Sequence, residues 1–161
     1  MLNFTGIPLE LQVAPQRFWE QFEAAIQSQN LPHPRTILPA SISHEEFCVQ
    51  LTRAFTASEF VAKTSAQKPA LLLELIESGV LFRAQADEDL DAFAEKINAG
   101  ISDADIDVRL RRERNKAMIR IIWRDLNRLA TMSEVTAELS RFADASIQLA
   151  AEYHYRVLEK M

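Results

Sequence analysis

The sequence predicts an all-α fold, a helical bundle of six or seven helices that ends in a long antiparallel helix hairpin. Two observations support this class. Apolar residues recur with helical spacing through most of the chain, and no segment of useful length shows the period-two alternation of a strand. Only three of the 161 residues are glycine, so few tight turns are expected.

The chain divides into an N-terminal helix with a proline-rich connector (residues 1–40) and a main helical domain (41–161), which together form one domain. Pro15 lies near the first turn of a helical pattern over residues 16–28. Pro32, Pro34 and Pro39 then require an extended connector over residues 31–39. Such a connector could leave the first helix loosely attached, or docked away from its sequence neighbours.

Three short helices are predicted next from their caps. Ser43 and Glu46 form a capping box before a helix that runs through Phe55. Ser58 or Thr56 caps a shorter helix. A third helix begins at a first-turn proline, residue 69, and stops at the glycine at residue 79.

Three further helices are predicted in the second half of the chain. Residues 87–98 carry apolar residues on one face and end before Gly100. Two long helices follow, over about residues 103–130 and 133–160. Thr131 and Glu134 form a second capping box between them, so the pair should turn back as an antiparallel hairpin.

Size and charge fit a soluble, cytoplasmic protein. Hydrophobic residues make up 48% of the chain and the net charge is −5, so the molecule as a whole does not attract polyanions and we expect no nucleic-acid partner. The chain has a single cysteine, no secretory leader and no apolar run long enough to span a bilayer. We therefore expect no membrane partner.

Residues 110–129 place six arginines, one lysine and a tryptophan in one predicted helix. Charge of this density could bind nucleic acid through the basic residues 111, 112, 114 and 116. However, residues 87–107 contain eight acids and one base, which can neutralise the basic block inside the domain if the two segments pack together. A structural role for the helix is favoured.

The middle of this helix is apolar around more than half its circumference, which is typical of a central helix contacted by several others. We expect Trp123 to lie beside the main apolar face. Arg120 and Arg124 should reach a carboxylate or the surface along their apolar stems. Asp125, on the main face, would need a partner such as Arg128 if buried. The predicted face consists of Leu110, Ala117, Met118, Ile121, Ile122, Asp125 and Leu129.

No residue is predicted to be catalytic, cofactor-binding or metal-binding. Asp103, Asp105 and Asp107 resemble the start of a calcium loop, but Val108 and Arg114 occupy the places of its glycine and its bidentate glutamate. The carboxylates instead suit the start of a helix.

His44 and Cys48 are four residues apart on one predicted helix, but two ligands do not make a zinc site. His33 and His154 cannot be assigned as partners from the sequence. A small buried cysteine beside an exposed histidine is the better interpretation. Nucleophile-elbow, P-loop and dinucleotide-binding motifs are all absent from the sequence.

Several segments resemble one protein family. Residues 110–126 match the pattern L-R-R-x-R-x-x-x-M-x-R-I-x-W-R-D-L, and residues 139–147 (LSRFADASI) match a later L-S-x-x-A-D-A-x-I segment. Residues 58–61 and 69–72 match more weakly. Over about residues 50–161 the chain is similar to the glutamine synthetase adenylyltransferase family. The signature positions, structural or interacting, are Arg111, Arg112, Met118, Arg120, Trp123, Arg124, Asp125, Ala143 and Asp144.

The resemblance implies a large bifunctional parent enzyme with two nucleotidyltransferase domains. One domain attaches AMP to a tyrosine of glutamine synthetase, and the other removes it by phosphorolysis. The catalytic domains carry a Gly-Ser dipeptide and a later Asp-x-Asp that holds magnesium. This chain has no Gly-Ser dipeptide, and its Asp-x-Asp precedes the arginine-rich helix.

The resemblance therefore implies a non-catalytic helical N-terminal module beside the first nucleotidyltransferase domain. ATP and magnesium would belong to the parent enzyme, as would the partners glutamine synthetase and the PII signalling protein. The alternative is a free-standing helical adaptor or oligomerisation module, in which Trp123, or Tyr153 and Tyr155, anchor a partner.

Overall fold

The structure, a computed structural model, describes residues 2–84, 86 and 106–158. Within these ranges it is all-helical, as predicted, and contains no strand. The predicted helix over residues 87–98 lies outside the described residues. The α-helices are α1 (Val13–Ser28), α2 (His44–Ala57), α3 (Glu59–Gln67), α4 (Pro69–Glu77), α6 (Ile106–Leu126) and α7 (Met132–Leu158), with 3₁₀ turns η1 (Leu9–Leu11) and η2 (Pro34–Thr36).

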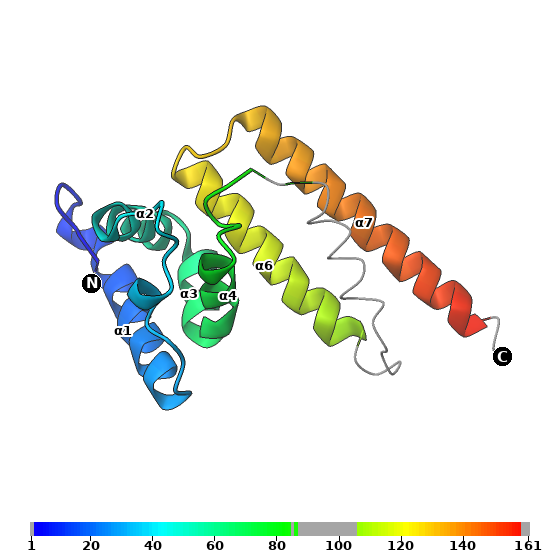
Figure 1. Ribbon diagram of the computed structural model, residues 1–161, viewed down its shortest axis with the longest axis horizontal. Helices are drawn as coiled ribbons and strands as arrows, with labels where there is room; N and C mark the ends of the chain where they lie inside the picture. The colour runs from blue at the N-terminus through cyan, green and yellow to red at the C-terminus, as the bar shows by residue number, and fades with distance from the viewer. Residues whose placement is uncertain (1, 85, 87–105, 159–161) are drawn as a thin grey trace.

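Helices α1 to α4 gather at one end of the molecule, and α6 runs past them with α7 alongside (Figure 1). Helix α1 packs most extensively against α3 rather than against α2, its neighbour in sequence. The connector that carries Pro34 makes this possible, because it leads the chain back across the bundle before α2 begins.

The main core lies between α1–α4 and the last half of α6, and aromatic rings occupy its centre. Trp123 of α6 stacks on Phe47 of α2, with ring centroids 5.9 Å apart, and meets Phe82 edge to face. Trp19 and Phe22 of α1 stack on each other on the opposite side of the core. Burial of several large rings at one junction fixes α6 against the bundle.

The predicted caps begin the helices. The Ser43 hydroxyl accepts from the Glu46 amide at the start of α2, and the Ser58 hydroxyl accepts from the Val61 amide at the start of α3. The capping box of α7 is complete. The Glu134 carboxylate accepts from the Thr131 amide at 2.7 Å, and the Thr131 hydroxyl accepts from the Glu134 amide at 3.2 Å.

Left-handed residues end three helices: Gly79 (φ +71°), as the sequence indicates, Asn30 (φ +52°) and Arg128 (φ +57°). The predicted end of α6 near residue 130 was four residues too late. The Leu129 amide bonds back to the Arg124 carbonyl at 2.8 Å, which closes a Schellman-type turn and stops the helix at Leu126.

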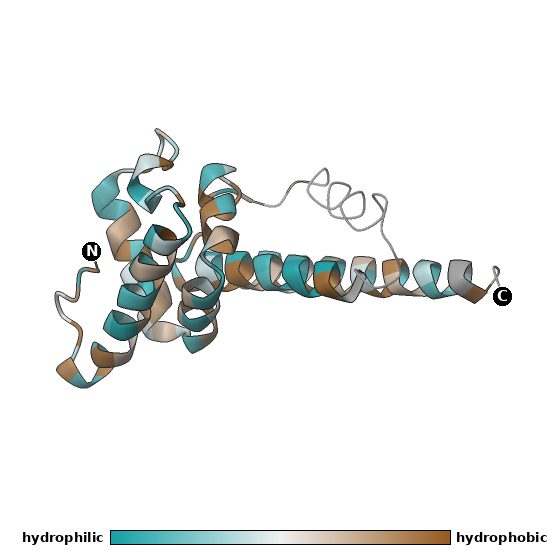
Figure 2. Cartoon of the chain, turned by 90° about the horizontal axis from the view of Figure 1, so that it is seen from below, coloured by the Kyte–Doolittle hydropathy of each residue, from teal (hydrophilic) through white to brown (hydrophobic). Residues whose placement is uncertain are grey.

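Helices α6 and α7 form the predicted antiparallel hairpin, and its far half extends away from α1–α4 as a two-helix arm (Figures 1 and 2). Leu149 is buried there among Leu110, Phe142 and Tyr153, in a small cluster separate from the main core. Among the described helices, none combines the length and apolar content needed to cross a membrane.

Candidate functional site

The arginine-rich helix and its partner α7 meet at a buried charge cluster. Arg120 and Arg124 lie one turn apart on α6, and both donate to the carboxylate of Glu138 on α7. The Arg120 Nη1 atom lies 2.5 Å from Oε2, and Arg124 Nη1 binds Oε1. The three side chains are only 8%, 3% and 4% exposed, so the cluster is buried, and one carboxylate is shared by two guanidiniums.

Backbone carbonyls complete the cluster. Arg120 donates from Nε to the Val80 carbonyl at 2.9 Å and from Nη2 to the Arg83 carbonyl at 2.9 Å, which ties the segment after α4 to α6. Arg124 donates to the Leu129 carbonyl at 2.8 Å in the turn of the hairpin. The two guanidiniums therefore hold α7, the turn and the segment after α4 to a single helix. Of the two predicted outcomes, a carboxylate or the surface, the structure shows the carboxylate.

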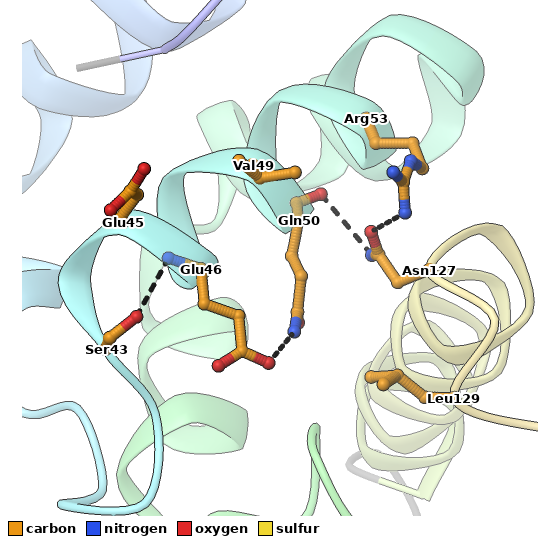
Figure 3. A pocket seen from close by; sticks show the side chains of 8 residues that line it. All are labelled: Ser43, Glu45, Glu46, Val49, Gln50, Arg53, Asn127 and Leu129. Carbon is orange, nitrogen blue, oxygen red and sulfur yellow. Dashed lines mark hydrogen bonds between the residues drawn. The ribbon is translucent and has the colours of Figure 1, made fainter.

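A second polar junction joins α6 to α2 and borders a shallow pocket of about 400 Å³ (Figure 3). The Trp123 indole donates to Gln50 Oε1 at 3.0 Å, and Asn127 Nδ2 donates to the Gln50 carbonyl at 3.3 Å. Gln50 in turn donates to Glu46, and Arg53 donates to Asn127 at 3.4 Å. Because these groups bind one another, this pocket is a structural seam rather than an open set of ligands.

The buried face of α6 overlaps the predicted face only in part. Ile121 is buried and Ile122 and Leu129 pack against the core, as predicted. Ile119 and Trp123 are fully buried, whereas Asp125, assigned to the apolar face, is exposed. Each residue turns an α-helix by about 100°, so Asp125 points roughly 200° away from Trp123. Packing against α1–α4 selected the face that bears the tryptophan. Asp125 therefore needs no buried partner.

The outer half of α6 uses part of its charge at the surface of the bundle. Arg112 and Lys116 both pair with Glu74 of α4, and Lys116 also lies 3.4 Å from Glu113. The Arg112–Glu74 pair, 44% and 40% exposed, contributes about 0–1 kcal/mol, so it orients α4 more than it stabilises it. The proposed neutralisation by residues 87–107 falls largely outside the described residues.

An apolar groove of about 630 Å³ runs between α6 and α7 on the outer half of the hairpin. Three signature residues line it, Met118, Ala143 and Arg111, and Arg111 and Arg114 form its basic border. Both arginines are exposed, and neither forms an ion pair with a residue that the structure describes. The remaining lining residues are Leu110, Leu139, Phe142, Ser146 and Ile147.

The signature positions therefore separate into three environments. Arg120, Trp123 and Arg124 are interior, and Arg111, Met118 and Ala143 lie at the groove. Arg112 pairs with Glu74, while Asp125 and Asp144 are exposed.

Burial removes one suggested partner anchor. Trp123 is fully buried, so it cannot anchor a partner protein as suggested. Tyr155 is 66% exposed and stays available, whereas Tyr153 packs with Leu149 in the far cluster of the hairpin.

The candidate His44–Cys48 pair does not converge on a shared site. Arg35 contacts both residues: its carbonyl lies 3.2 Å from His44 Nε2, and its guanidinium lies 3.6 Å from the Cys48 sulfur. His44 is exposed and Cys48 is half-buried. His33 caps η2 and His154 contacts Tyr153. No group of three metal-binding side chains occurs among the described residues.

Sequence reasoning missed Glu138, the centre of the cluster. A signal was present, because Glu138 interrupts an apolar stripe with 3,4 spacing formed by Val135, Phe142, Ala145 and Leu149. A carboxylate in such a stripe is buried and needs a cation. Gln50, which binds the indole of Trp123, carries no comparable signal.

The fold and this site define a class of protein: a small helical bundle with a two-helix arm. A buried arginine–glutamate cluster joins the two helices of the arm, and an apolar groove lies between them. Comparison with known families then identifies the chain further. Residues 48–161 match the family described as glutamate-ammonia ligase adenylyltransferase, and the chain belongs to this family.

Curated relatives carry the name bifunctional glutamine synthetase adenylyltransferase/adenylyl-removing enzyme. The chain is 40% identical to the Pseudomonas aeruginosa protein over 113 residues, which is 70% of this chain and 12% of that protein. It is 34% identical to the Nitrosococcus oceani protein over 155 residues, 95% of this chain and 15% of that protein. The Pseudomonas putida protein is also 34% identical, over 92% of this chain and 15% of its own length. No solved structure gave a significant match.

Proposed function

We propose that this chain is a non-catalytic helical module of a bifunctional glutamine synthetase adenylyltransferase/adenylyl-removing enzyme, and that it supports the adjacent nucleotidyltransferase domain. The main support is the use of the signature charges. Arg120 and Arg124 bind Glu138 and backbone carbonyls, so these two signature residues act in the fold. Family membership supplies the parent enzyme.

In this proposal the hairpin is a rigid arm. The bundle of α1–α4 holds one end, the charge cluster prevents α7 from rotating against α6, and the outer half presents a surface to the neighbouring domain. ATP and magnesium bind to the catalytic domains of the parent enzyme. That enzyme acts in the cytoplasm, in the regulation of nitrogen metabolism. Glutamine synthetase and the PII protein are partners at that level.

Calorimetric titration of this chain with Mg-ATP tests the proposal that catalysis belongs to the nucleotidyltransferase domains of the parent enzyme and not to this chain. We expect no saturable heat, because Arg112, Arg120 and Arg124 are internally bonded and the exposed pair Arg111 and Arg114 borders an apolar groove. Saturable binding in the micromolar range would overturn the proposal.

A chimera tests the supporting role. This chain would replace the matching segment of the Nitrosococcus oceani enzyme, with Glu138→Ala and, as a matched control on the same helix, the exposed Asp144→Asn. We expect Glu138→Ala to lower both activities in proportion to the loss of folded enzyme, with KM for ATP unchanged. A raised KM in fully folded chimera would show that the module contacts the substrate.

A nucleic-acid-binding domain is a weaker candidate. Arg112 and Lys116 pair with α4, whereas Arg111 and Arg114 border the groove on another side of α6, so the four do not form one strip. Titration with duplex DNA at low salt should show no binding with the steep salt dependence of phosphate contacts.

A further inference from the structure

The groove between α6 and α7 combines an apolar floor with a basic edge. Leu139 and Ile147 of α7 are 39% and 68% exposed, so part of the apolar floor is open to solvent. The guanidiniums of Arg111 and Arg114 stand at the α6 edge without a carboxylate among the described residues. Lys116 and Arg112, only a few residues away, do have one.

We propose that this groove docks an acidic amphipathic helix, which belongs to the remainder of the family enzyme outside the matched segment. The inference rests on the proposed function and names the surface through which the module would act. From Leu110 to Met118 the groove runs about 12 Å at 1.5 Å per residue, which matches roughly two turns of a helix laid along it. Apolar residues at i, i+3 or i+4, and i+7 would fill the floor.

Charge complementarity determines the polar face of the partner. Asp or Glu side chains beside the apolar stripe of the docked helix would meet Arg111 and Arg114 at the rim, where charge steers association and selects partners. A basic or neutral helix would leave both guanidiniums unpaired. The partner is therefore acidic on the flank that faces α6.

A second copy of this chain suits the groove less well. Groove-to-groove pairing about a two-fold axis that runs across the groove brings the same rim from each copy together, so arginine would approach arginine. Each copy also carries a net charge of −5, which opposes self-association.

Most of each curated relative lies outside the matched segment, since the chain spans 12–15% of the relatives described above. A helix in the same polypeptide reaches the groove at an effective concentration in the millimolar range. A modest interface of this kind is then occupied if its intrinsic Kd is below about 1 mM.

The test uses this chain and overlapping labelled peptides of about 20 residues, long enough for several helical turns, taken from the Nitrosococcus oceani relative outside its matched segment. Fluorescence anisotropy is measured up to millimolar chain concentration. We expect one or a few acidic amphipathic peptides to bind with Kd below about 1 mM, and we expect their affinity to fall as salt is added. No binding at that concentration, or selection of basic peptides, overturns the inference.

Two surface variants locate the binding. The double variant Arg111→Glu, Arg114→Glu should raise the Kd of the acidic peptides by at least about tenfold. The second variant, Ile147→Asp, should raise it further. All three residues are exposed, so the fold should be retained, and circular dichroism checks this. The matched controls are Arg128→Glu and Asp144→Lys, at two residues that do not line the groove. Equal binding by all variants overturns the inference.

Sedimentation tests the competing occupant. If the chain is a dimer that Ile147→Asp converts to a monomer, the groove is a self-interface and the inference is wrong. The outcome is separable from that of the Mg-ATP titration: nucleotide binding would remove the proposed function and leave peptide docking measurable, whereas failed docking would leave the supporting role intact.

Discussion

The Nη1 atom of Arg120 on α6 lies 2.5 Å from Oε2 of Glu138 on α7, and both side chains are more than nine-tenths buried. The second oxygen of the same carboxylate accepts from Arg124. A buried ion cluster of this kind is weak evidence for stability, because desolvation offsets its Coulomb energy. Its clearest effect is geometric: α7 can sit on α6 in only one register without leaving a charge unpaired.

Removal of the shared carboxylate should be severe. Glu138→Ala removes the carboxylate that both buried guanidiniums bind, and we expect the free energy of unfolding to fall by about 3–5 kcal/mol. Urea unfolding followed by circular dichroism measures this. Asp144→Asn, an exposed change on the same helix, should shift it by less than about 0.5 kcal/mol.

Replacement of the whole cluster distinguishes specificity from stability. The triple variant Arg120→Met, Arg124→Leu, Glu138→Met should recover most of the stability that Glu138→Ala loses, because no buried charge remains. We expect looser register between the helices, seen as broadened NMR signals from α7. A triple variant as unstable as Glu138→Ala would contradict this account.

The hydrogen bond between Trp123 and Gln50 should appear as a coupling. Trp123→Phe leaves Gln50 Oε1 without its 3.0 Å donor, and Gln50→Leu leaves the indole N–H unpaired in the core. Each single variant should be destabilised, while the double variant should be more stable than the sum of the two effects predicts, by about 1 kcal/mol. A double-mutant cycle in urea measures the difference. Strict additivity would show that the bond contributes nothing.

Arg128 offers a stabilising substitution. Its φ of +57° places a Cβ in the left-handed region at the end of α6. Arg128→Gly should raise the free energy of unfolding by about 0.5–1 kcal/mol, which would be seen as a higher midpoint of thermal unfolding. Arg128→Ala removes the same charge but keeps the Cβ, so it should bring no such gain. Equal behaviour of the two variants would rule out backbone strain as the cause.

The start of α7 should depend on pH. Bonds from the Thr131 amide and hydroxyl lower the pKa of the Glu134 carboxyl below its ordinary value of 4.5. A lowered pKa in the folded state means that the stabilisation is present above about pH 4.5 and is lost as pH falls through the folded value. NMR titration of the carboxyl carbon reports that pKa directly.

Glu134→Gln provides the matched comparison. The stability difference between wild type and Glu134→Gln should be constant near neutral pH and disappear in acid. Ser140→Ala, which alters an exposed polar residue on the same helix, should run parallel to wild type throughout. A Glu134→Gln profile that stays parallel to wild type down to acid pH would mean that the carboxylate does not act as a cap.

Much of the fold could be predicted because its signals are local. Ser43, Ser58 and Thr131 begin helices through bonds to amides three residues away, and Gly79 ends one through its own backbone freedom. The end of α6 could not be predicted in the same way. The left-handed residue there is an arginine, which has no such preference, and the bonds of Arg124 and Asn127 hold it in place.

The sequence by itself determined the helical class, the hairpin, the family resemblance and the expectation that Arg120 and Arg124 reach a carboxylate or the surface, since each depends on spacing along the chain or on residue identity. Only the tertiary structure decided which carboxylate they find, which face of α6 is buried, and where an apolar groove stays open. The physical reason is that α6 is apolar around much of its circumference. Its spacing permits several faces, and packing against α1–α4 on one side and α7 on another selects one, placing Trp123 inside and Asp125 in solvent.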